Sequence, residues 1–125
     1  MTIAGINHVQ IAMPRGAEAD VRRFYGELLG LREIPKPAPI AMRGGAWFEV
    51  GSLQLHFGVD PDFRAAKKAH VAFDVEDYEA LIVRCRTAGH EPRFDTSLPD
   101  CRRFFIDDPF GNRLELIEAS TTAVG

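Results

Sequence analysis

Residues 6–13, INHVQIAM, and residues 68–75, KAHVAFDV, decide the fold, because each is a short strand with a histidine near its start. Polar and apolar side chains alternate in both stretches, which is the period-two pattern of a strand with one buried face. The two histidines, His8 and His70, stand 62 positions apart. The chain therefore contains the same strand twice, which indicates an internal repeat.

A helical pattern follows each of these strands. Apolar residues recur at i, i+3, i+4 and i+7 in residues 17–29 and again in residues 78–88. Each pattern ends at a glycine, Gly30 or Gly89, the residue that most readily takes the left-handed conformation of a helix C-terminus. Asp77 suits the N-cap of the second helix. The sequence thus predicts one amphipathic helix per repeat.

Three further strands are predicted after each helix, at residues 31–34, 46–50 and 53–57 and at residues 91–94, 103–107 and 113–118. This order predicts an α+β fold in which two tandem βαβββ modules form a cupped mixed sheet with the helices on its outer face. We expect a single domain over residues 1–125, with module one at 3–59, a polar linker at 60–67 and module two at 68–119. The proline-rich residues 35–39 predict a stiff loop.

The polar side chains of these strands share one face of the predicted sheet. Because side chains alternate along a strand, His8 and His70 lie opposite the apolar residues that pack under the helices. Glu115, on the last strand, takes the same face. A polar sheet face can simply meet water. Two imidazoles and a carboxylate at equivalent positions, however, form an ordinary divalent-metal set, so these three side chains are predicted metal ligands.

A fourth ligand is predicted on the strand at residues 53–57. Aligning residues 53–55, LQL, with residues 114–116, LEL, makes Gln54 the counterpart of Glu115 and favours Gln54 as the ligand. His56 lies two residues further along the strand on the same face, and imidazole is the better metal ligand. Gln54 and His56 therefore both remain candidates for the fourth ligand. His90 has no counterpart in the other module and is expected to be a surface residue.

Composition narrows the class of protein. The 125 residues include 15 basic and 18 acidic ones, a net charge of −3, which provides no basic stripe for nucleic acid. The two cysteines, Cys85 and Cys101, form no CxxC motif and are expected to be free thiols in a reducing compartment. No apolar run approaches the roughly 18 residues of a membrane span, and no targeting segment is recognisable. We expect a cytoplasmic protein with no membrane partner.

Four stretches of the chain resemble the vicinal oxygen chelate superfamily, which includes glyoxalases, fosfomycin-resistance and bleomycin-resistance proteins and extradiol dioxygenases. They are residues 6–9, 24–31 and 69–73 and, most specific, residues 105–115, which contain a DPxGxxLE motif. The resemblance covers residues 3–118. It implies a divalent metal ion (Mn, Fe, Ni, Co or Zn) bound by His8, His70 and Glu115, a small-molecule substrate and a homodimer.

The resemblance leaves three functions open. The first is a lyase or isomerase whose substrate chelates the metal through vicinal oxygens, with Glu115, or whichever of Gln54 and His56 is not a ligand, also moving a proton. The second is an extradiol-type dioxygenase, and the third is a metal-free binding protein of the bleomycin-resistance type. Ala12 stands where the glutathione-dependent glyoxalases have an arginine, and residues 94–100 lack the lysine of the fosfomycin-modifying enzymes. Neither of those two activities is expected. Arg102 and Arg103 are predicted near the mouth of the site, as solvated charges or as contacts for an anionic substrate.

Overall fold

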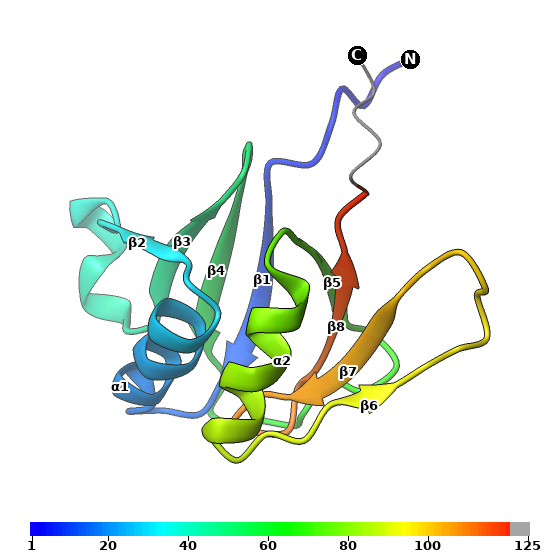
Figure 1. Cartoon of the computed structure of the whole chain (residues 1–125). Coiled ribbons are helices and arrows are strands. Elements are labelled where there is room, and N and C mark those ends of the chain that lie inside the picture. The colour runs from blue at the N-terminus through cyan, green and yellow to red at the C-terminus, as the bar shows by residue number, and fades with distance from the viewer. Residues whose placement is uncertain (121–125) are drawn as a thin grey trace. The chain divides into compact units, whose positions relative to one another are not determined.

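The chain divides into two compact units, of which the first ends at Arg64 and the second begins at Ala65. The structure is a computed structural model and describes residues 1–120. Each unit contains one βαβββ module (Figure 1). The predicted α+β fold with two tandem modules is confirmed.

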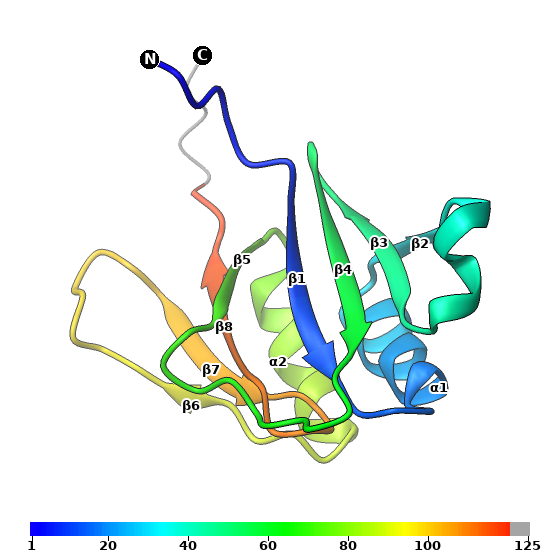
Figure 2. The same cartoon turned by 180° about the vertical axis from the view of Figure 1, so that it is seen from behind.

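The first unit contains a four-stranded mixed sheet in the order β1-β4-β3-β2. Its parallel pair is formed by the first and last strands, which lie side by side in Figure 2, and the other pairs are antiparallel. The elements in chain order are β1 (His8–Met13), α1 (Glu18–Val21), η1 (Arg22–Leu28), β2 (Arg32–Ile34), η2 (Ala38–Arg43), β3 (Ala46–Val50) and β4 (Leu53–Val59).

The second unit repeats this topology in its own four-stranded sheet, in the order β5-β8-β7-β6. Again the first and last strands pair in parallel and the rest are antiparallel. The elements are β5 (Val71–Val75), α2 (Tyr78–Thr87), β6 (Arg93–Phe94), β7 (Arg103–Asp107) and β8 (Arg113–Glu118). Backbone hydrogen bonding therefore forms two sheets, one for each module.

Three local features differ from the sequence prediction. The first predicted helix has only one turn of α-helix, α1, and continues as the π-helix η1, whose wider turn is closed by the amide of Leu29 donating to the carbonyl of Phe24 at 3.0 Å. The proline-rich loop passes into the 3₁₀-helix η2, which begins directly after Pro37. His70 precedes β5 instead of lying within it.

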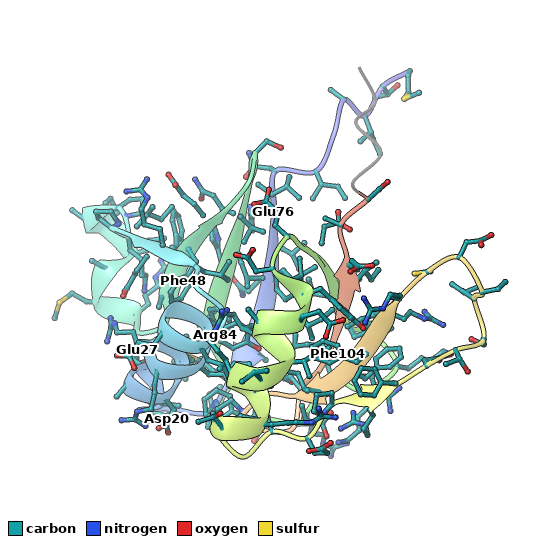
Figure 3. All side chains as sticks on the ribbon, in the orientation of Figure 1. Asp20, Glu27, Phe48, Glu76, Arg84 and Phe104 are labelled. Atoms are coloured by element: carbon teal, nitrogen blue, oxygen red, sulfur yellow. The ribbon has the colours of Figure 1, made fainter. Side chains whose placement is uncertain are left out.

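Helices cover the apolar face of the sheet in each unit. In the first unit the ring of Tyr25 lies 4.5 Å from that of Phe57, and in the second the ring of Tyr78 lies 5.5 Å from that of Phe104. Phe48 and Phe104, labelled in Figure 3, are fully buried. Burying one such side chain stabilises the fold by about 1.5–3 kcal/mol. The predicted division of each sheet into a helix-covered apolar face and a polar face is confirmed.

Both cysteines are free: Cys85 is buried on α2 and Cys101 is half-buried. Burial raises the pKa of the Cys85 thiol. Within residues 1–120, no helix combines the length and the apolar character needed to cross a bilayer.

Candidate metal centre

Three aromatic side chains form a stack on the polar face of the first sheet. The His56 ring lies between that of Trp47, at 3.7 Å and nearly parallel, and that of His8, at 4.2 Å. His56 is only 5% exposed, although it faces away from the helix-covered core. The two-residue turn between β3 and β4 places Trp47 directly opposite His56, and β4 lies beside the strand that carries His8.

The two candidates for the fourth ligand bind each other. The ring nitrogen Nε2 of His56 lies 2.9 Å from Oε1 of Gln54 and donates to it, since an amide oxygen only accepts. Burial, followed by the nearby charge of His8, lowers the pKa of His56. The His56 side chain is therefore held in its neutral form, with Nε2 already occupied.

Each first-strand histidine has one ring nitrogen anchored to an oxygen. Nδ1 of His8 lies 2.9 Å from Oδ1 of Asn7, and Nδ1 of His70 lies 2.9 Å from the carbonyl oxygen of Lys68. Because both partners are acceptors, each Nδ1 carries a proton and Nε2 is the nitrogen that can face a metal ion. In His8 this leaves the lone pair on Nε2, whereas Nε2 of His70 donates a hydrogen bond to Glu115 and has to give up that proton to bind a metal ion. Histidines that bind metal ions are oriented in this way, by an N–H bond to a backbone carbonyl or another acceptor.

Glu115 is the centre of a charged cluster in the second unit. Its Oε1 lies 2.8 Å from Nε2 of His70, and its Oε2 accepts a hydrogen bond from Nη1 of Arg103 at 2.8 Å. Burial alone raises the pKa of this carboxyl, but the hydrogen bonds from Arg103 and His70 outweigh burial and lower it below the ordinary value. Glu115 is therefore an ionised carboxylate at neutral pH, held beside an imidazole.

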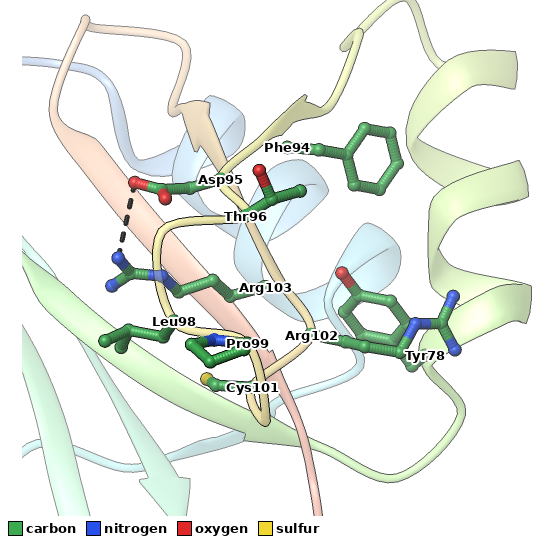
Figure 4. A pocket seen from close by; sticks show the side chains of 9 residues that line it. All are labelled: Tyr78, Phe94, Asp95, Thr96, Leu98, Pro99, Cys101, Arg102 and Arg103. Atoms are coloured by element: carbon green, nitrogen blue, oxygen red, sulfur yellow. Dashed lines mark ion pairs between the residues drawn. The ribbon is translucent and has the colours of Figure 1, made fainter.

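The two arginines predicted near the site are both paired with carboxylates. They line a hollow of about 300 Å³ in the second unit, where Arg103 also bonds Asp95 at 3.3 Å (Figure 4). Arg102 bonds Glu118 and lies over the ring of Tyr78, 4.8 Å from its centroid. Neither guanidinium is simply a solvated charge at the end of a strand, and Arg103 positions Glu115.

The strand register alters the comparison between Gln54 and His56. In the second unit Ala72, two residues after His70, pairs with Glu115. In the first unit Gln10, two residues after His8, pairs with His56. Counted from the two histidines, His56 and not Gln54 is the counterpart of Glu115. The sequence alignment favours Gln54, two residues away, and a shift of two residues leaves every side chain on the same face of a strand.

Each unit supplies a part of the predicted ligand set. His8, Gln54 and His56 lie together in the first unit, and His70 and Glu115 lie together in the second. In the described part of the chain, no group of three or more histidine, cysteine or acidic side chains is arranged to hold a metal ion. The complete ligand set therefore stays a prediction.

The sequence analysis did not single out Trp47, and it predicted Arg103 near the mouth of the site but not as a partner of Glu115. Trp47 covers His56, and Arg103 binds Glu115. Hairpin register could have identified both, because the turn at residues 51–52 places Trp47 opposite His56 and the turn at residues 108–112 places Arg103 diagonal to Glu115.

Two successive βαβββ modules are the fold of the vicinal oxygen chelate class of proteins, and this chain has a histidine at or directly before the first strand of each. The model of the glyoxalase-like domain family matches residues 10–117, nearly the whole chain. The chain belongs to this glyoxalase-like family of the vicinal oxygen chelate superfamily. No curated protein matches the chain.

Solved structures show the same fold. A protein from Bacillus anthracis assigned to the glyoxalase family is 44% identical, with a TM-score of 0.91 over 96% of this chain and 98% of that one. A lactoylglutathione lyase from Agrobacterium tumefaciens is 17% identical, with a TM-score of 0.71 over 94% and 96% of the two chains. A variant of the fosfomycin resistance protein FosX from Listeria monocytogenes, complexed with Mn(II) and a dihydroxypropylphosphonic acid, is 14% identical, with a TM-score of 0.79 over 96% and 95%. The last two show a likeness of fold alone.

Proposed function

We propose that this chain is a metal-dependent lyase or isomerase that acts on a small substrate with two adjacent oxygens. His8, His70 and Glu115 are the proposed ligands of one divalent ion (Mn, Fe, Ni, Co or Zn), and Gln54 or His56 completes the set. The Mn(II) held by a FosX structure of the same fold supports a metal in this class of protein. We further propose that the protein acts as a homodimer in the cytoplasm.

The observation that carries this proposal is the matched anchoring of the two first-strand histidines. In both units Nδ1 is bonded to an oxygen acceptor at 2.9 Å, which directs Nε2 toward the proposed metal ion. The proton that Nε2 of His70 shares with Glu115 is released when the ion binds. Glu115 adds a carboxylate oxygen 2.8 Å from Nε2 of His70. Two imidazole nitrogens and a carboxylate oxygen are the donor atoms that borderline divalent ions prefer.

The residues have distinct roles in the proposed reaction. A bound divalent ion supplies a Lewis acid that polarises the substrate's oxygens. Glu115 is ionised, so it enters the reaction as a ligand or a proton acceptor and not as an acid. Arg103 keeps it in that form through its bond to Oε2. Trp47 packs against His56 and excludes water from that side of the first-unit cluster.

A dioxygenase is the second candidate, because the same two histidines and one glutamate have the composition of the facial triad of non-haem iron oxygenases. The two reactions differ in their co-reactant. The protein is loaded with Fe(II) under anaerobic conditions and then mixed with a catechol in oxygenated buffer. If it is a dioxygenase, it consumes oxygen. A lyase or isomerase converts its substrate with no uptake of oxygen.

Metal titration of tag-free protein tests the proposal. We expect chelator-treated protein to bind one Mn(II), Fe(II), Co(II), Ni(II) or Zn(II) per chain in calorimetry, and His70→Ala and His8→Ala to lose at least about tenfold in affinity. His90→Ala is the matched control and should bind like the wild type. No uptake of any of the five ions would contradict the proposal and favour a metal-free binding protein. Sedimentation of the same samples tests the homodimer.

A further inference from the structure

A second hollow, in the first unit, is bordered by η2 and by the ends of β3 and β4. Its volume is about 230 Å³. Its walls include an amide, two basic side chains, an aromatic ring and apolar groups, among them Gln10, Lys36, Ile40, Arg43, Trp47 and Gly58. The volume is below the roughly 300 Å³ at which sites for drug-sized ligands begin, so the hollow suits one small chemical group.

The charged side chains that line this hollow are both basic. Lys36 and Arg43 line it, and no carboxylate does. The ammonium of Lys36 donates to the backbone carbonyl of Gly44 and not to an acid. By contrast, Arg22 and Arg32 on the same unit are bonded to glutamates at 2.9 and 2.5 Å. A concave surface lined by two cations concentrates small anions. The carboxylate of Glu18 lies beside the wall, where it accepts a hydrogen bond from the amide of Gly45 at 3.0 Å, and does not line the hollow.

Two glycines shape the backbone here: Gly58 in the wall of the hollow and Gly45 next to the wall residue Gly44 in the chain. A Cβ at Gly58 would lie 2.6 Å from Nε2 of Gln10, so the side chain of Gln10 can cross β4 only because Gly58 has none. At Gly45, where φ is +84°, a Cβ would lie 1.9 Å from the carbonyl oxygen of Phe57, which requires glycine in the segment that follows η2. A polar amide therefore joins the two cations in the wall.

One aromatic stack connects the hollow with a proposed metal ligand. Trp47 lines the hollow and stacks on His56, which stacks on His8. All these residues belong to the first unit. The hollow and the proposed ligand His8 are therefore linked by two ring contacts within one unit.

We propose that this hollow binds the oxyanion of the substrate, so that the substrate is a small carboxylate, phosphate or phosphonate held by Lys36, Arg43 and the amide of Gln10. This inference rests on the proposed function for its link to catalysis. Anion binding itself needs no metal, so the metal-dependent function and the oxyanion site can be tested separately.

Trp47 is the single tryptophan of the chain and reports on the hollow directly. Its fluorescence is quenched with iodide and, separately, with neutral acrylamide, at constant ionic strength. We expect the double variant Lys36→Gln with Arg43→Gln to reduce iodide quenching at least about twofold, because the local anion concentration falls, and to leave acrylamide quenching unchanged. The double variant Arg15→Gln with Arg64→Gln removes two charges from the same unit outside the hollow and should behave like the wild type. Equal iodide quenching in all three proteins would overturn the inference.

The second arm uses phenylphosphonate and neutral benzyl alcohol, titrated against Trp47 fluorescence in the full chain. Phenylphosphonate is expected to bind at least about tenfold more weakly to the Lys36→Gln, Arg43→Gln variant, the effect of losing its ionic contacts. Benzyl alcohol should show no such difference. His70→Ala, which tests the metal site, should still respond to phenylphosphonate. If His70→Ala loses the metal while the basic-residue variant binds phenylphosphonate as the wild type does, the proposed function stands and this inference is wrong.

Discussion

Replacing Glu115 by glutamine tests the charged cluster of the second unit, because it removes one negative charge and keeps the shape of the side chain. The Glu115 side chain is 9% exposed and contacts Arg103 and His70 at 2.8 Å each. Hydrogen bonds to charged groups contribute about 1.5–3 kcal/mol each, and removing one partner of a buried ion pair costs about 3–5 kcal/mol. Arg103 keeps its bond to Asp95, and the glutamine oxygen still accepts one hydrogen bond. We therefore expect a loss of about 2–3 kcal/mol in the free energy of unfolding.

Urea unfolding of chelator-treated protein at neutral pH, followed by circular dichroism, measures this loss as a shift of the midpoint at constant slope. Glu118→Gln is the matched control, since Glu118 lies on the same strand but is 37% exposed and bonds Arg102 at 3.0 Å. An exposed ion pair of this kind contributes about 0.2–1 kcal/mol. Equal losses in the two variants would refute the idea that Glu115 is the buried centre of the cluster.

Three further measurements follow from burial and backbone geometry. Burial raises the pKa of the Tyr78 hydroxyl above its ordinary value of 10.0. The stability that this shift contributes is complete below pH 10.0 and is lost as the pH rises through the pKa of the folded state. Tyr78→Phe should therefore flatten the alkaline fall in the free energy of unfolding. Cys101 should react with a disulfide reagent in the native protein, whereas buried Cys85 should react only on unfolding, and equal rates would contradict the packing of α2. Gly45→Ala should lower the midpoint of thermal unfolding more than Gly30→Ala, because both have positive φ but only Gly45 has a carbonyl in the place of a Cβ; the reverse order would count against the backbone path after η2.

The sequence predicted the fold well because strand alternation and the glycines that end helices are both local signals. The strands Ala46–Val50, Arg103–Asp107 and Arg113–Glu118 have the predicted bounds, and the helix stops at Gly30 and Gly89 occur at positive φ as expected. The π-helix η1 was not predictable in this way, because its buried residues keep nearly the same apolar spacing as an α-helix. The hydrogen-bond pattern alone distinguishes them.

The site illustrates a limit of the same periodicity. Alternation identified the polar face that carries His8, Gln54 and His56, but a shift of two residues leaves the face unchanged, so it could not decide which side chain matches Glu115. The hydrogen-bond register decides this, and it depends on turn lengths and strand starts. Similarly, the charge of Arg103 was visible in the sequence, but its bond to Glu115 depends on a diagonal contact between two strands.

Pulsed electron paramagnetic resonance of Mn(II)-loaded, tag-free protein tests the proposed metal centre most directly, since it counts the imidazole nitrogens bound to the ion. We predict two coordinated imidazoles in the wild type if Gln54 completes the set and three if His56 does, with one fewer in either His8→Ala or His70→Ala. Glu115→Gln should keep the wild-type count at weaker affinity. A wild-type spectrum with no imidazole nitrogen, or the same count in all four proteins, would contradict the assignment of His8 and His70 to one ion.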